Sequence, residues 1–258
     1  MRFDLLGVQM AVTASAEQQR LLLDLQALDT KLLQLAHKRT GAPEISQVQD
    51  LEVELGSIKM RLVAAQTEAS DLKLNQLKAE ADVDQVVTRT KRDQDRLDSG
   101  AVSAPKELES LQHEIATLGK RQAELEDVEL EIMQNLENAQ SAAAQLQSDD
   151  TETTQKLADA IQARDDVFAD IDFEIKSLTT QRTEISGSLP VDLIAMYDKI
   201  RSDHGGIGAA MIQRRTCQGC NLTIDAQELD KIRGLAADAI VRCDECRRIL
   251  VRTAESGL

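Results

Sequence analysis

The sequence has very few aromatic residues. Three Phe, one Tyr and no Trp make up 2% of the 258 residues, and there are only three prolines and twelve glycines. Charged residues reach 29%. A chain this poor in aromatics and rich in Ala, Leu, Glu and Gln is typical of long, narrow helices, so the thick core of an ordinary globular domain is not expected.

Long apolar runs are missing as well. No stretch approaches the roughly eighteen residues that a membrane-spanning helix needs, so no contact with a membrane is expected. The opening segment MRFDLLGVQMAV is interrupted by Asp4 and Gln9 and lacks a cleavage region, which argues against a signal peptide. We therefore expect a cytoplasmic protein.

The scarce prolines and glycines divide the chain. Proline cannot continue a helix but suits its first turn, so each proline marks a candidate restart. Breaks are predicted at residues 41–43, 98–105 and 187–190. In the second break, Gly100 can take the left-handed conformation that ends a helix, and Ser103 can cap the next one.

Between the breaks, apolar residues recur at alternating steps of four and three. The first arm carries this pattern from Leu21 to Leu97, with Asp93 among its polar interruptions, and the second arm carries it from Leu108 to Leu178. A period of this kind, sustained over many turns, is typical of a coiled-coil seam and not of a globular amphipathic helix.

The two arms have matching lengths. As helices, residues 17–97 and 105–186 would each extend on the order of 120 Å. Folding back on each other in antiparallel register would bury both apolar stripes within one chain, with Leu25 near Leu178. A parallel dimer of extended chains is the alternative, but the equal lengths would then be a coincidence. The pattern favours the hairpin.

All four cysteines occur as two Cys-x-x-Cys pairs, Cys217 with Cys220 and Cys243 with Cys246. Two such pairs match a four-thiolate structural zinc site, because each turn points two sulfurs at one ion. The alternatives are two disulfides, a redox-active pair, or an iron site of the rubredoxin type. A disulfide scaffold suits a secreted chain and a redox pair suits a βαβ unit. The spacing favours a single structural Zn²⁺.

The residues around the cysteines predict a small β ribbon. Strands are expected at 209–216, 239–242 and 249–252, with a short helix over 225–235. A closed four-ligand site leaves no position for water or substrate, so the metal is expected to hold structure and not to catalyse. With so small a core, the ribbon should depend on its metal for folding.

The predicted fold class is therefore mainly α: a long antiparallel coiled-coil hairpin followed by a small C-terminal β zinc ribbon. The predicted domains are an N-terminal tail (1–15), the hairpin (16–188) and the four-cysteine zinc ribbon (189–258). Within the ribbon domain, a short amphipathic helix containing Tyr197 is expected to dock the ribbon onto the base of the hairpin.

The turn sequence GAVSAPKELESLQHEI and the ending IVRCDECRRILV resemble those of bacterial four-cysteine zinc-ribbon proteins with a coiled-coil hairpin. The resemblance spans residues 16–253. Members of that family usually have a glycine directly after the fourth cysteine and an aromatic residue closing the ribbon, where Arg247 and Val251 stand here. Similar proteins in some flagellated relatives are implicated as a chaperone for the enhancer-dependent sigma factor and as messenger-RNA binders. The resemblance implies these two roles as candidates for this chain.

The charge is distributed unevenly. Residues 190–258 hold ten Lys and Arg against ten Asp and Glu, so the whole net charge of −15 falls on residues 1–189. An acidic rod repels nucleic acid, and any such contact should concentrate on the ribbon. The candidate nucleic-acid-binding residues are its arginines: Arg214, Arg215, Arg242, Arg247, Arg248 and Arg252. No aromatic side chain lies in residues 209–258 to stack on bases, which weakens this interpretation.

The turn of the hairpin is a second candidate contact, because charged residues cluster there. They are Asp93, Asp95, Asp98 and Lys106. No arrangement typical of a catalytic site stands out, and a two-helix rod has little room for a substrate pocket. We therefore expect a non-enzymatic interaction protein that binds a protein partner through the coiled coil or ribbon, in transcription or RNA handling. A nucleic-acid-binding protein acting through the ribbon arginines is the alternative, and no small-molecule substrate is expected.

Overall fold

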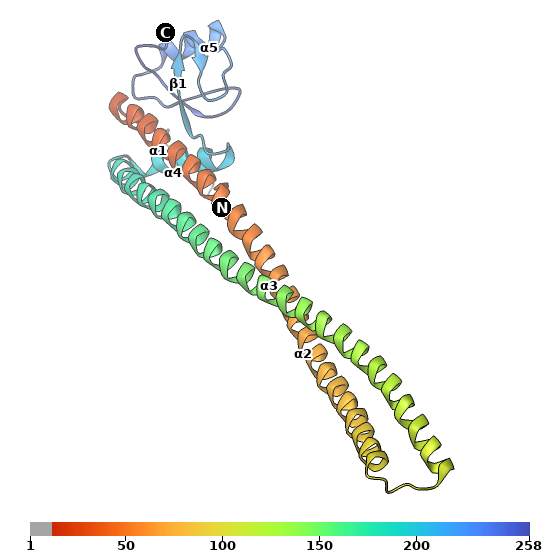
Figure 1. Cartoon of the computed structure of the whole chain (residues 1–258). Coiled ribbons are helices and arrows are strands. Elements are labelled where there is room, and N and C mark those ends of the chain that lie inside the picture. Colours follow the sequence, from red (N-terminus) through yellow and green to blue (C-terminus); the bar gives the residue numbers. More distant parts are fainter. Residues whose placement is uncertain (1–11) are drawn as a thin grey trace, which may run out of the picture. The chain divides into compact units, whose positions relative to one another are not determined.

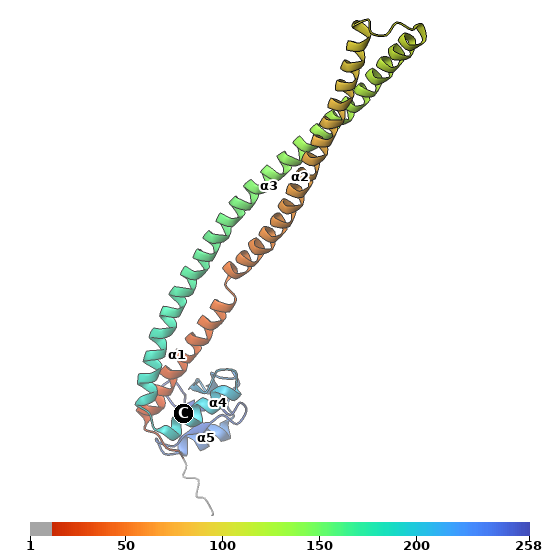
Figure 2. The same ribbon diagram turned by 90° about the horizontal axis from the view of Figure 1, so that it is seen from below.

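A computed structural model describes residues 12–258 of the chain (Figures 1 and 2). Three long helices come first: α1 (Ala16–Thr40), α2 (Pro43–Asp98) and α3 (Pro105–Gly187). The shorter α4 (Val191–Asp203) follows. No helix within residues 12–258 is long and apolar enough to cross a membrane.

The helices end where the sequence places its breakers. Proline opens both α2 and α3, because its fixed φ suits a first helical turn. Gly100, with φ +70°, takes the left-handed conformation predicted for the turn between them. The predicted cap at Ser103 is wrong by one residue. Since Pro105 is the first helical residue, Ala104 stands at the cap position, and its carbonyl accepts from the N–H groups of Glu107 and Leu108.

The contacts divide the chain into two compact units, which we describe separately. One unit comprises residues up to Pro43 together with Ala163–Leu258, and the other comprises Glu44–Gln162. The second unit is a helical hairpin in which α2 runs antiparallel to the first part of α3, on either side of the turn (Figures 1 and 2). Its seam includes a buried cluster of Ile58, Leu62 and Leu146. The predicted antiparallel coiled-coil hairpin is thus confirmed.

In the first unit, α1 pairs with the last part of α3. Leu28 and Leu35 form a buried cluster with Ile171 and Leu178. Leu25, expected beside Leu178, belongs instead to the neighbouring cluster that joins these helices to α4 and the ribbon.

The ribbon follows α4 and contains a four-stranded sheet of order β2-β1-β4-β3. Its strands are β1 (Ala209–Gln213), β2 (Thr216–Cys217), β3 (Val241–Arg242) and β4 (Ile249–Val251), and α5 (Ala226–Gly234) connects β2 to β3. β1 pairs parallel with β4 and antiparallel with β2, and β3 pairs antiparallel with β4. The single strand predicted over 209–216 is two strands, because Arg214 and Arg215 form a tight turn at positive φ.

The first part of the predicted N-terminal tail lies outside the described residues. Its last residues join the ribbon. Thr13 forms an antiparallel bridge with Ala239, and Ala14, which is buried, donates its N–H to the carbonyl of Asp238 at 2.9 Å. Ser15 then caps α1 in a capping box with Gln18. This stretch is therefore held to the structure just before the first helix begins.

A buried polar cluster holds the ribbon against the helices. The Asp29 side chain in α1 is only 1% exposed. One of its oxygens lies 2.7 Å from Arg182 Nε of α3 and 3.2 Å from Arg201 Nη1 of α4. The other accepts from the Tyr197 hydroxyl at 2.8 Å. We call these four residues, with Gln26, the Asp29 cluster.

Gln26 extends the Asp29 cluster to the segment that enters β1. Its Oε1 accepts from the backbone N–H of Gly208 at 2.7 Å and of Ala209 at 3.3 Å, and its Nε2 donates to the Gly206 carbonyl at 2.9 Å. Burial, reinforced by the bond to Asp29, raises the pKa of Tyr197 well above its ordinary value. The ribbon thus shares a core and a hydrogen-bond network with α1, α3 and α4.

Candidate metal centre

The four cysteine sulfurs meet between two matching turns of the ribbon. Cys217 ends β2, and Cys220 follows it in the first turn. Cys243 follows β3, and Cys246 precedes β4. Each turn closes with the same backbone bond, from the residue after the second cysteine to the carbonyl of the first, at 2.8 Å in both cases. The two pairs therefore approach as near copies of one local structure.

The distances between the sulfurs fit one tetrahedral ion. With zinc–sulfur bonds of about 2.3 Å, neighbouring sulfurs of a tetrahedron lie about 3.8 Å apart. Cys217 and Cys246 are 3.8 Å apart, Cys220 and Cys243 are 4.0 Å apart, and all four sulfurs lie within 4.8 Å of one another. These close pairs run between the turns and not within a Cys-x-x-Cys motif. The arrangement suits a single shared ion, whereas a redox pair would bring together the two cysteines of one motif.

The surroundings act differently on the thiols. Burial raises the pKa of Cys217 to about 12 and also raises the pKa of Cys243. Burial pushes the pKa of Cys246 in the same direction, but N–H groups of Arg248 and the neighbouring thiols outweigh it and lower the value to about 7. Because zinc binds thiolates, loading the centre releases the protons that burial favours on the other sulfurs.

The Arg248 side chain packs against the first cysteine turn. Its guanidinium donates to the carbonyls of His204, Ile207 and Gly219, at 3.0, 3.1 and 2.9 Å. It thereby connects the first cysteine turn to residues 204–208, the segment in which Gly206 and Gly208 are hydrogen-bonded to Gln26. A Cβ at Gly219 would lie 2.8 Å from the Arg248 Cδ, so this glycine is required by close packing.

Arg252 and Arg242 also serve the fold. The Arg252 guanidinium donates to five carbonyls at and after the end of α5, and the Arg242 Nε donates to the Arg247 carbonyl at 2.9 Å. Of the six predicted nucleic-acid-binding arginines, Arg214, Arg215 and Arg247 are exposed. Sequence reasoning missed the bonds of Arg248 and Arg252 because their accepting carbonyls lie 13 to 44 residues away and are brought close only by the fold.

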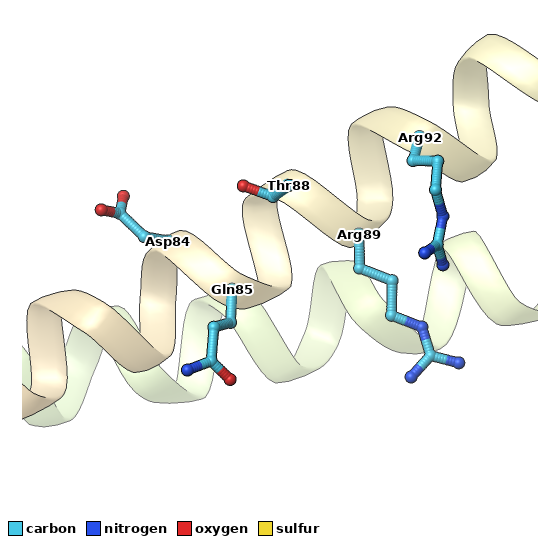
Figure 3. A pocket seen from close by; sticks show the side chains of 5 residues that line it. All are labelled: Asp84, Gln85, Thr88, Arg89 and Arg92. Atoms are coloured by element: carbon cyan, nitrogen blue, oxygen red, sulfur yellow. The ribbon is translucent and has the colours of Figure 1, made fainter.

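The predicted contact at the hairpin turn is wrong for Asp93. This carboxylate is buried, lying 3.9 Å from Arg89 and 3.4 Å from Arg92. Figure 3 shows both arginines on one side of α2, where they line a shallow hollow, and Arg89 also pairs with Glu114 of α3. Asp93 occupies a seam position of the heptad pattern, which explains its burial. The other three predicted residues, Asp95, Asp98 and Lys106, are exposed.

Arg247 adopts a conformation that costs energy. Its φ is +61°, in the left-handed region that a glycine adopts freely and a side chain with a Cβ does not. Replacing it by glycine should therefore stabilise the ribbon by about 1 kcal/mol, measured as greater resistance to zinc removal by a competing chelator.

The matched control is Asn221→Gly. Asn221 holds the equivalent place in the first cysteine turn, with φ +60°, but asparagine tolerates this region better, so the gain should be smaller. If Arg247→Gly lowers the resistance to chelation, the arginine side chain contributes contacts that outweigh its backbone strain.

Two family models match the sequence. A "CT398-like coiled coil hairpin domain" matches residues 25–205, and a "C4-type zinc ribbon domain" matches residues 216–250. The second match includes all four cysteines. Together with the sulfur geometry, it identifies the ion as one structural Zn²⁺ and disfavours disulfides and an iron site.

Relatives share nearly the whole chain. An uncharacterized protein of Mycobacterium tuberculosis is 36% identical over 93% of this chain and 97% of its own length. One of Mycobacterium leprae is 30% identical over 84% of this chain and 93% of its own. A solved structure from Mycobacterium smegmatis has a TM-score of 0.80 at 32% identity, over 93% of this chain and all of that one. CT398 from Chlamydia trachomatis shares the fold, with a TM-score of 0.67 at 20% identity over 92% and 98% of the two chains.

Proposed function

Because the chain belongs to the family of CT398-like coiled-coil hairpin proteins with a C4-type zinc ribbon, we propose that it is a non-enzymatic adaptor that binds a protein partner through its ribbon. The observation that carries the proposal is the saturated metal centre. Four thiolates fill a tetrahedral ion, so no coordination position remains for a substrate or an activated water. The zinc instead fixes the surface around it.

A small hollow lies beside the zinc centre. Its volume is about 120 Å³, and it lies between α5 and the second cysteine turn. Its lining combines three apolar side chains, four carboxylates and one cation: Leu222, Ile224, Leu250, Asp225, Glu228, Asp244, Glu245 and Arg242, whose Nε donates to the Arg247 carbonyl. Leu222 is 50% exposed at its edge, so its side chain is accessible to a partner. We call this feature the ribbon hollow.

The chemistry of the ribbon hollow favours a particular kind of partner. Its size suits one aliphatic side chain, and its acidic rim suits lysine or arginine on either side of that side chain. Asp225 already caps α5, accepting from the Glu228 N–H at 2.8 Å, and Glu228 pairs with Lys231. The carboxylates of Asp244 and Glu245 are exposed on the second turn, where a basic peptide can reach them.

The arginines give less support to a nucleic-acid partner. Three of the six guanidinium groups donate to backbone carbonyls, as described above. The exposed arginines are then Arg214 and Arg215, at the turn between β1 and β2, and Arg247, on the second cysteine turn. Residues 209–258 contain no aromatic side chain on which a nucleic-acid base could stack beside these arginines. A role in transcription or RNA handling would therefore come through the protein partner.

Photo-crosslinking in the native host tests the proposal. A photoreactive residue at Leu222 should give a protein adduct that survives nuclease, whereas one at Val191, 83% exposed on α4, should not. Reversing the rim with Asp244→Lys and Glu245→Lys should reduce the adduct at least tenfold, while Asp238→Lys, outside the ribbon hollow, should leave it unchanged. Adducts that disappear with nuclease, or with Arg214→Ala and Arg215→Ala, would overturn the proposal in favour of nucleic acid.

A further inference from the structure

The ribbon hollow has a cation of the same chain beside its rim. Lys231 lies on α5 three residues after Glu228, on the same side of the helix, and its Nζ is 3.0 Å from Glu228 Oε2. Glu228 lines the ribbon hollow with a side chain that is 17% exposed, whereas the Lys231 side chain is 71% exposed and lies outside the lining. Lys231 therefore reaches this carboxylate from the solvent side.

Lys231 also lies in the field of two further carboxylates of the ribbon hollow. A hydrogen bond to Glu228 and the charge of that carboxylate are the main causes that raise the pKa of Lys231 above its ordinary value, and Asp244 and Asp225 add to them. All three carboxylates line the hollow. The ammonium group thus stands where we expect a basic side chain of the partner to bind.

The four carboxylates of the ribbon hollow differ in how a partner can reach them. Asp225 accepts from the Glu228 N–H as the cap of α5, and Glu228 itself holds the Lys231 ammonium group. Asp244 and Glu245 are exposed on the second cysteine turn. A first cation from a partner can therefore bind at the second cysteine turn directly. A second cation, on the α5 side, must compete with Lys231 for Glu228.

The cation that lines the hollow, Arg242, is held more firmly than Lys231. The Arg242 Nε donates to the Arg247 carbonyl at 2.9 Å, within the second cysteine turn. Lys231, by contrast, contacts Glu228 through an exposed ion pair at the end of a flexible four-carbon side chain. Exposed ion pairs contribute little to stability, so Lys231 can leave Glu228 without disturbing the fold.

We propose that Lys231 is an internal competitor of the partner: it occupies Glu228 in the free protein and is displaced when a basic side chain of the partner binds there. This inference rests on the proposed function and assigns Glu228 as the carboxylate that receives the partner's cation on the α5 side. Lys231 then lowers the affinity that a basic segment gains from its second cation.

Calorimetry on the full-length, zinc-loaded protein tests the competition, with the blocked peptide Gly-Ser-Lys-Leu-Arg-Ser-Gly as the probe. At low salt, Lys231→Gln should bind this peptide about threefold more tightly than the wild-type chain, because Glu228 no longer holds an internal cation. The difference should vanish in about 0.5 M salt, where exposed charges are screened.

Arg233→Gln is the matched control. Arg233 forms the same kind of pair on α5, with Asp230 three residues earlier at 2.7 Å, and neither residue lines the ribbon hollow. This variant should bind the peptide like the wild-type chain. Zinc content and circular dichroism should be unchanged in all variants, because the substituted side chains make no contact with the metal centre.

Glu228→Gln separates competition at one carboxylate from a general effect of charge. In the Glu228→Gln background, adding Lys231→Gln should change the affinity little, because the carboxylate for which the two cations compete is gone. Equal gains with and without Glu228, or wild-type affinity in Lys231→Gln, would overturn the competition while leaving the basic-peptide site in place. Absence of binding to every variant would overturn both the competition and the basic partner assigned to the ribbon hollow.

Discussion

Replacing Cys220 with serine should abolish zinc binding and unfold the ribbon while most of the helical structure survives. The ribbon core is small, and binding of a structural zinc contributes on the order of 10 kcal/mol to the folding of such domains. Without the ion, burial keeps protons on Cys217 and Cys243, and the four sulfurs no longer hold the two cysteine turns together through metal bonds. This is the largest effect of a single substitution that we expect in this protein.

Hydrogen exchange measured by mass spectrometry, with zinc content measured on the same samples, should show the pattern. Residues 209–252 should lose protection in Cys220→Ser. The start of α1 and α4 should lose part of theirs, because Ala209 and Ile249 belong to the same buried cluster as Leu22 and Tyr197. The hairpin of α2 and the first part of α3 should keep its protection.

Gln218→Ala is the matched control, since this exposed residue lies in the same turn and is not a ligand. It should bind one zinc and exchange like the wild-type protein. A zinc-free Cys220→Ser variant with a protected ribbon would show that the metal is not required for the fold. Loss of protection throughout α2 and α3 would show that the hairpin does not stay folded when the ribbon unfolds.

The second large effect is expected at Asp29. Asp29→Ala leaves the cations of Arg182 and Arg201 and the hydroxyl of Tyr197 without their shared carboxylate. Removing one partner from a buried ion pair typically costs about 3–5 kcal/mol. The loss should lie at the lower end of that range, because Arg182 and Arg201 are 21% and 36% exposed and both keep Asp198 as a partner, at 2.7 and 3.6 Å. The bond to Asp29 is also the main cause that raises the pKa of Arg182.

Urea unfolding followed by tyrosine fluorescence measures this loss. Tyr197 is the only tyrosine and there is no tryptophan, so the signal reports on the Asp29 cluster itself. Asp172→Ala is the control, because Asp172 pairs with Arg39 at the surface, where the side chains are 55% and 43% exposed. Exposed pairs contribute at most about 1 kcal/mol. Equal losses in the two variants would contradict the role assigned to the Asp29 cluster.

The sequence was most informative where periodicity or spacing is local. Seven-residue steps predicted the hairpin, and the two Cys-x-x-Cys pairs predicted the zinc ribbon, since each depends on residues close together in the chain. Asp93 shows how a charge can mislead. The cluster near the turn made it a candidate contact, but its position in the seam already indicated the burial that the structure shows.

The Asp29 cluster could not be predicted from the sequence, for a physical reason. Its members come from α1, α3 and α4, and each alone looks like an ordinary polar residue on a helix. The amphipathic helix around Tyr197 predicted that something docks there, but not which polar groups would meet. Arg248 and Arg252 are similar cases. Their adjacency to the zinc ligands and strands suggested a binding surface, whereas their guanidinium groups donate to carbonyls brought close only by the fold.

X-ray absorption at the zinc edge, on the purified full-length protein with its metal content measured, tests the central claim most directly. Four cysteine thiolates around one ion predict one zinc per chain and a first shell of four sulfurs at about 2.3 Å. Nitrogen or oxygen atoms in that shell, or fully reduced thiols in a folded chain that holds no metal, would contradict the four-thiolate centre on which the fold of the ribbon depends.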